Sequence, residues 1–275
     1  MALSVATNIG ALAASKAASS VNASMETSMA RLSSGKRINS AADDSAGLAI
    51  ASRLTSEARG LDMAARNAAD AQAMINTIES AHNEIHNILQ RMRELAVQGA
   101  NDTNGTDDRT NIRKELTELH EEIDAIKDQT KWAGQSLISG ASTFKFQIGD
   151  EASEQLTVTT TAIASSTLSV GSTNVTGLTT SGSFTAFITT VNNAISSIAN
   201  YRAEYGANSN RLDHVMSNLA TNAESVKASL GRIEDTDYAA ETTDLAKSQI
   251  LQQAATSMLA QANASKQTIL SLIQG

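Results

Sequence analysis

The chain has 275 residues, no cysteine, no proline, 3% aromatic residues and a formal net charge of −8 at pH 7. The absence of cysteine excludes disulfides, thiolate metal sites and cysteine nucleophiles, and an acidic balance without a dense run of Lys and Arg argues against general nucleic-acid binding. Average proline usage of about 5% predicts roughly fourteen prolines in a chain of this length. Because proline ends helices, its absence allows long uninterrupted helices.

The N-terminal segment 1–14 is apolar and rich in alanine, but it has no basic region before the apolar residues and no long Leu-rich stretch. It therefore differs from a secretory signal peptide. No run in the sequence approaches the ~20 apolar residues of a membrane span. We expect no cleaved signal peptide and no membrane insertion.

The two ends of the chain have similar compositions. Residues 1–35 and 245–275 both place apolar residues at spacings that permit helices, on a background of small and polar residues. Neither end can bury much, since an Ala methyl contributes about 0.8 kcal/mol against about 1–2 kcal/mol for ordering each residue of backbone. We expect both ends to be mobile in the monomer and to become ordered when a partner supplies a second apolar face.

Three central stretches carry apolar residues at alternating spacings of three and four, which predicts amphipathic helices over 61–98, 112–126 and 184–233. His82 is the one polar residue in the stripe of the first helix. Thr106 is expected to cap the second helix, which should fold back antiparallel on the first because the connection is short. Gly206 is a possible break in the third.

Alternating apolar and polar residues at 144–148 and 156–159 predict a small hairpin between the second and third helices. The segment 155–201 contains no Asp, Glu, Lys or Arg. The predicted fold class is mainly α: a long antiparallel helical rod or coiled-coil bundle formed by paired N- and C-terminal segments, with a small β-hairpin region in the middle of the chain.

Few residues suggest catalysis or metal binding. His82 and His86 have a spacing that can bind zinc, but Glu84 is one residue away from the position of the catalytic base in zinc proteases, so a helix surface is the better interpretation. Asp43 and Asp44 could hold a metal, yet they fit better as caps of a helix that begins near Ser45. We therefore predict no catalytic, metal-binding or cofactor-binding residue and no enzyme activity.

Long ordered segments at both ends of the chain resemble bacterial flagellins. They are ARLSSGKRINSAADDSAGLAI at 30–50, NILQRMRELAVQGANDTN at 87–104, RIEDTDYAAE at 232–241 and QILQQAATSMLAQAN at 249–263. The resemblance covers residues 1 to about 149 and about 205–273. The intervening segment is short, so the chain resembles a form without large outer domains.

The resemblance implies a terminal core domain of residues 1–42 and 235–275, and a helical rod domain of residues 43–234 with a short β or outer segment at about 140–183. It also implies a structural subunit of the extracellular flagellar filament, exported unfolded through the flagellar type III system and added at the distal tip. The implied partners are further copies of the chain, the filament cap, the hook–filament junction proteins, and an export chaperone at the C-terminal helix.

Two groups of contact residues follow from the resemblance. We expect the terminal assembly interface to contain Leu3, Val5, Ile9, Leu12, Leu251, Met258, Leu259, Ile269 and Leu272. On the rod, the resemblance implies a surface for subunit contacts that the Toll-like flagellin receptor also recognises. The matching positions are Gln90, Arg91, Glu94, Leu95, Gln98 and Glu115.

The uncharged segment has two interpretations: a plain β-rich surface, or a surface with O-linked sugars such as flagellins often carry. The candidate acceptors are Ser165, Ser166, Thr167, Thr179, Thr180 and Ser181. The sequence departs from the family at 264–267, where a proline between two glutamines is usual. The alternatives to a filament subunit are a hook–filament junction protein of the same architecture and a cytoplasmic coiled-coil adaptor.

Overall fold

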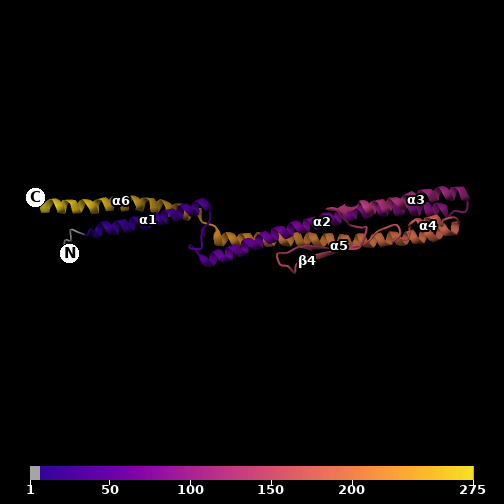
Figure 1. The fold of residues 1–275 in the computed structure, drawn as a ribbon, viewed down its shortest axis with the longest axis horizontal. Helices are drawn as coiled ribbons and strands as arrows, with labels where there is room; N and C mark the ends of the chain where they lie inside the picture. The colour runs from indigo at the N-terminus through magenta and orange to yellow at the C-terminus, as the bar shows by residue number, and fades with distance from the viewer. Residues whose placement is uncertain (1–6, 275) are drawn as a thin grey trace. The chain divides into compact units, whose positions relative to one another are not determined.

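The structure is a computed structural model that describes residues 7–274, with side chains described as far as residue 266. The described residues form six α-helices and two small antiparallel sheets (Figure 1). Their contacts divide the chain into two compact units, residues 1–57 with 225–275, and residues 58–224. The domain boundaries near residues 42 and 235 stay a prediction.

In the first unit, α1 (Ile9–Ser34) and α6 (Tyr238–Gln274) lie side by side (Figure 1). The side chain of Asn8 caps α1 by accepting from the Ala11 amide at 3.0 Å, and Gly35 ends the helix in the left-handed conformation with φ 72°. Contacts between the helices show an antiparallel pair: Asn8 donates to the Ala262 carbonyl (3.1 Å), Gln252 to Asn22 (2.8 Å) and the Tyr238 hydroxyl to the Leu32 carbonyl (3.2 Å).

The turn that follows α1 is held by backbone pairing and by carboxylates. Lys36 forms an isolated antiparallel bridge with Asp235. Asp43 accepts hydrogen bonds from Ser40 and Asn39, which lower the pKa of its carboxyl group. Asp44 accepts from the Gly47 amide at 2.8 Å in the first turn of α2 (Ser45–Gly99). The predicted capping role is confirmed for Asp44, whereas Asp43 stabilises the turn before the helix and does not cap it.

The second unit is built around α2, α3 (Thr106–Gln129) and α5 (Ser181–Glu234). The three predicted helical stretches lie inside these elements, and Gly206 does not interrupt α5. The N-cap of α3 was predicted wrongly: it is Gly105, whose amide donates to Asp108 at 3.0 Å. Large side chains of all three helices fill one core, among them Met74, Leu89, Met92, Leu116, Phe184 and Tyr205.

The predicted hairpin is β3 (Ser142–Gln147) paired with β4 (Gln155–Thr160). Two further short strands, β1 (Lys131–Trp132) and β2 (Gln135–Ser136), and the one-turn helix α4 (Ser172–Thr176) had no clear signal in the sequence. The hairpin lies against α2, where Asn67 donates to the Gln147 carbonyl at 2.9 Å. The mainly α fold with a small β-hairpin region is thus confirmed.

Candidate assembly and recognition surfaces

The helix pair of α1 and α6 buries polar residues and exposes apolar ones. Among residues 9–34 and 238–266, the buried side chains are Ser28, Glu241 and Ser248. The large exposed hydrophobic side chains of the two helices, together named the terminal surface, are Ile9, Leu12, Met29, Tyr238, Ile250, Leu251 and Met258. Other large apolar side chains of the pair, such as Val21, Met25 and Leu245, are half-buried. Over these ranges the pair therefore exposes part of its apolar surface and buries none of its large apolar side chains fully.

The contact between the two helices is also loosely packed. A pocket of about 420 Å³ between α1 and α6 is lined mainly by hydroxyl and charged side chains. Arg31 approaches Glu241 at 3.6 Å across it, and the Arg31 Nε atom is buried without a partner among the described residues. Such an interface contributes little burial of apolar area, which is the main favourable term in helix packing.

The structure places the residues predicted for terminal assembly as follows. Ile9, Leu12, Leu251 and Met258 are exposed, and Leu259 is half-buried. Leu3 and Val5 lie outside the described residues, as do the side chains of Ile269 and Leu272. Met29 and Ile250 were not named in the predicted interface, although the apolar pattern of the two ends contains both.

On the rod, Arg91 joins two helices through its guanidinium group. It donates to Glu115 of α3 from Nε (3.0 Å) and Nη2 (2.8 Å), and to Glu94 of its own helix from Nη1 (3.1 Å). The hydrogen bonds that Arg91 donates to Glu115 and, second, to Glu94 raise the pKa of Arg91. All three side chains are exposed, so the structure brings these predicted residues together as one charged cluster on the surface.

The other predicted rod residues divide between surface and core. Gln90 is exposed and pairs with His86 at 2.8 Å, and Gln98 is exposed at the end of α2. Leu95, however, is only 2% exposed and belongs to the core. We correct the prediction for Leu95: its side chain is part of the buried core of the rod and is not available to a partner. We define the rod surface as Gln90, Arg91, Glu94, Gln98 and Glu115.

The hydroxyl candidates for glycosylation also differ in accessibility. Ser166, Thr167, Thr179 and Thr180 are exposed, and Ser181 is half-buried. Ser165 is only 4% exposed and its hydroxyl donates to Asp124 at 2.7 Å, so the folded chain does not offer it for modification.

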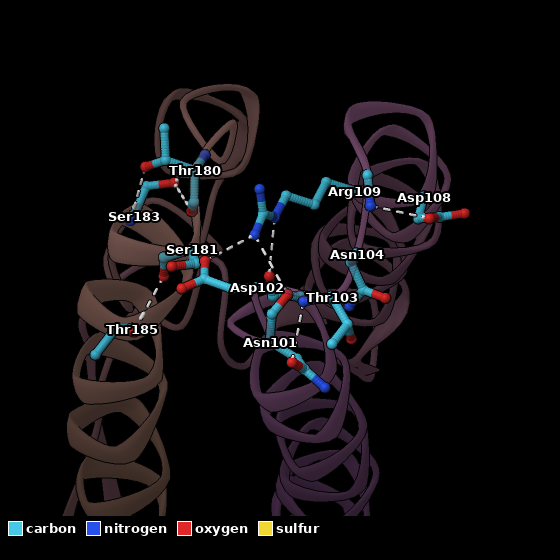
Figure 2. A network of polar contacts seen from close by, with 12 residues as sticks. Asn101, Asp102, Thr103, Asn104, Asp108, Arg109, Thr180, Ser181, Ser183 and Thr185 are labelled. Carbon is cyan, nitrogen blue, oxygen red and sulfur yellow. Dashed lines mark hydrogen bonds and ion pairs between the residues drawn. The ribbon is translucent and has the colours of Figure 1, made fainter.

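Thr180 has a structural role at the start of α5. Its hydroxyl oxygen accepts from the Ser183 amide at 3.2 Å while the Ser183 hydroxyl accepts from the Thr180 amide at 3.1 Å (Figure 2). This reciprocal arrangement satisfies amides at the helix start that have no partner inside the helix.

Figure 2 also shows Arg109 of α3 reaching back to the turn after α2. Its guanidinium donates to the carbonyls of Gly99 (3.2 Å) and Asn101 (3.3 Å) and to the carboxylate of Asp102 (3.3 Å). These bonds hold the short connection that makes α2 and α3 antiparallel. Sequence reasoning did not identify Arg109, since it lies among other charged residues at the start of a helix.

The two histidines of α2, His82 and His86, differ in burial. His82 is fully buried between the helices, with its ring 5.3 Å from that of Tyr205. Neither ring nitrogen of His82 has a hydrogen-bond partner among the described residues. No group of three or more His, Cys, Asp or Glu that could hold a metal ion occurs in residues 7–266. No helix in the described part of the chain is long and apolar enough to span a membrane.

Both ends of the chain match known protein families. Residues 5–143 match the family model of the bacterial flagellin N-terminal helical region, and residues 188–273 match that of the bacterial flagellin C-terminal helical region. The segment between the two matches contains β4, α4 and the start of α5.

The chain is also similar to individual proteins over most of its length. It is 34% identical to Flagellin B of Vibrio anguillarum over 99% of this chain and 100% of the relative, and 37% identical to a flagellin of Bacillus subtilis over 97% and 98%. The first alignment extends over 375 positions against the 275 residues of this chain, so that relative contains segments that this chain lacks. A solved structure described as a putative flagellar hook-associated protein of Vibrio parahaemolyticus has a TM-score of 0.61 at 16% identity, covering 70% of this chain and 100% of that one, and shows a shared fold.

Proposed function

The chain belongs to the bacterial flagellin family as a short form without large outer domains, and from this membership we propose that it is exported, added at the tip of the extracellular flagellar filament and locked there through the terminal surface. Being a flagellin makes it a structural filament subunit. The route of export and the residues that drive addition are the parts of the proposal that need support from this chain.

The observation that carries the proposal is the exposure of large apolar side chains in the α1 and α6 pair. Leu12 is 69% exposed and Met258 is 65% exposed, while Ser28 and Glu241 are buried. Each fully buried Leu or Met side chain contributes about 1.5–3 kcal/mol. The monomer does not gain this free energy of burial, because these side chains are exposed. A neighbouring copy that covers the terminal surface would bury them and gain it.

The test uses two charge insertions on the same helix. Met258→Asp places a carboxylate on the terminal surface, and Gln261→Asp places the same group on an exposed polar position of α6. We expect Met258→Asp to abolish sedimentable filaments and Gln261→Asp to polymerise like the parent. Filaments of normal length from Met258→Asp would contradict the proposal, as would filaments from a chain lacking residues 251–275.

Export in an unfolded state accounts for two further features. A chain without cysteine cannot become crosslinked on its way out, and an α6 with an exposed apolar face offers a binding site for an export chaperone before assembly. The filament cap and the hook–filament junction proteins complete the proposed partners. The copurification of a chaperone with the chain, and its loss from Met258→Asp, would test the α6 assignment.

The rod surface is proposed to mediate subunit contacts and to bind the Toll-like flagellin receptor. The support is geometric: Arg91 and Glu115 come from two helices and present one exposed charged cluster. Arg91→Glu should reduce receptor signalling by the monomer at least about tenfold, which corresponds to about 1.4 kcal/mol. Lys114→Glu, a charge reversal at an exposed residue of the same region, is the control. Unchanged signalling by Arg91→Glu would refute the assignment.

O-linked modification is proposed for the exposed hydroxyls Ser166, Thr167, Thr179 and Thr180, with Ser181 as a half-buried candidate. The support is a surface segment without charged residues. The intact mass of the protein from its native source decides this point, since a mass equal to that of the unmodified sequence rules the modification out.

The alternative of a hook–filament junction protein has the same expected architecture. The similarity to the hook-associated structure is at 16% identity and speaks only for the fold, whereas the flagellin relatives are 34% and 37% identical. Electron microscopy of purified protein separates the two, because a filament subunit forms long filaments and a junction protein does not propagate.

A further inference from the structure

A second pocket lies in the rod, between the loop at 162–169 and the helix α5. Its volume is about 300 Å³, at the lower end of the range of small-molecule sites. Six polar side chains line it: Thr167 and Ser169 from the loop, and Thr190, Asn193, Ser197 and Tyr201 from α5. Small apolar side chains complete the walls. The loop lies between the segments that match the two flagellin family models.

The loop that forms one wall is held in place by the rest of the rod. Ser165 donates to Asp124 of α3 from its amide (3.1 Å) and its hydroxyl (2.7 Å). The Val170 amide donates to the Ser165 carbonyl at 2.8 Å, and the Val170 side chain is buried. Asn174 donates to the Ser169 carbonyl at 2.5 Å. The pocket is therefore formed before any ligand arrives, which lowers the entropic cost of binding.

Several polar groups of the pocket have no partner within the chain. Ser197 and Thr190 donate to carbonyls of their own helix. In the part of the chain that the structure describes, no hydrogen bond is made by the side chains of Thr167, Ser169, Asn193 or Tyr201. Three hydroxyls and one carboxamide can thus both donate to and accept from a ligand.

The pocket is uncharged. None of the lining residues is acidic or basic, and the whole segment 155–201 lacks Asp, Glu, Lys and Arg. Hydrogen bonds to a phosphate, a carboxylate or an ammonium group are strongest with a charged partner, which this lining does not provide. A neutral ligand rich in hydroxyl groups matches the donors and acceptors that are present.

We propose that this pocket binds a neutral saccharide unit non-covalently. The free hydroxyl and carboxamide groups hydrogen-bond to the sugar hydroxyls, while Tyr201, Leu168 and Ala194 contact its C–H faces. Tyr201 has both properties that such a site needs, an apolar ring and a polar end. The binding is independent of filament assembly and is measurable in the monomer.

The experiment follows amide shifts by NMR in the full-length monomer, produced in a host that leaves its intact mass equal to that of the sequence. The probes are glucose, mannose, galactose and N-acetylglucosamine, each titrated to about 10 mM, since single-sugar affinities near 1 mM correspond to about −4 kcal/mol. At least one sugar should shift resonances of 162–169 and 190–201 saturably. Glycerol is the control, because it has hydroxyl groups but no ring.

Two variants test the pocket and one tests specificity. Asn193→Ala and Tyr201→Phe should weaken binding at least about tenfold, whereas Asn200→Ala, an exposed asparagine on the same helix outside the pocket, should bind like the parent. Thr167→Ala on the loop replaces any variant whose melting temperature falls. The proposal is overturned if no sugar of the panel shifts these resonances, if glycerol shifts them equally, or if the pocket variants bind unchanged.

Discussion

The rod and the terminal helix pair are both helical, but they bury their apolar side chains to different degrees. In the rod, Met74, Leu89 and Phe184 are fully buried between helices. In the pair of α1 and α6, the large apolar side chains are exposed or half-buried, and the fully buried residues include Ser28 and Glu241. A region can therefore be helical without burying its large apolar side chains in a core of its own. The rod buries its own core, and the pair leaves apolar side chains exposed for the contacts with neighbouring copies that we propose.

The largest expected effect contrasts a core residue with a residue of the terminal surface. Phe184→Ala removes a fully buried ring and should lower the free energy of unfolding of the rod by about 3–5 kcal/mol. Ile250→Ala changes a side chain that is 67% exposed and should alter monomer stability by less than about 0.5 kcal/mol. Urea unfolding followed by circular dichroism measures both. Equal losses would remove the contrast between the two regions.

The next effect is a pH dependence confined to the rod. Burial, followed by the charge of Arg202, lowers the pKa of His82 from 6.5 to about 4. The unfolded chain therefore takes up this proton first as the pH falls. The contribution of His82 is fully present above about pH 6.5 and is lost progressively towards pH 4, by on the order of 3 kcal/mol.

Unfolding free energies measured from pH 7 to pH 4 in the parent, His82→Leu and His214→Gln test this effect. His214 is an exposed histidine of α5 and serves as the control. The slope should flatten in His82→Leu and persist in His214→Gln. A parent-like slope in His82→Leu would show that His82 is not the titrating group.

A smaller effect comes from glycines in the rod helices. A Cβ added at Gly99 would lie 2.5 Å from Cε1 of the buried Phe184 ring, and Gly99→Ala should cost about 1–3 kcal/mol through overpacking. Nothing lies within 4 Å of a Cβ at Gly206, so Gly206→Ala should stabilise α5 by about 0.5–1 kcal/mol. Thermal melts of the two variants should move in opposite directions, and shifts of the same sign would contradict the packing of α2 against α5.

The long helices and the hairpin were predictable because their signals are local and periodic. Alternation in the sequence predicted the two strands of the hairpin, and the structure adds their register, in which Phe144 pairs with Val158. The N-cap of α3 was predicted one residue late, because Thr106 is an equally good capping residue and only the structure shows that Asp108 bonds to the Gly105 amide.

The site predictions failed where exposure depends on tertiary packing. Leu95 lies in a motif with exposed neighbours, yet one position along a helix changes the direction of a side chain by about 100° and places Leu95 in the core. In sequence, Ser165 is no different from the serines and threonines around it. In the structure, its hydroxyl donates a hydrogen bond to Asp124, which is far away in sequence. The role of Arg109 likewise depends on carbonyls at the end of another helix.

Hydrogen exchange of the same chain as monomer and as filament tests the central claim most directly. We expect the amides of α1 and α6 to exchange fast in the monomer and to become protected in the filament, while the α2, α3 and α5 amides of residues 58–224 are protected in both states. Strong protection of α1 and α6 in the monomer, unchanged on assembly, would contradict the claim that the terminal pair depends on neighbouring chains.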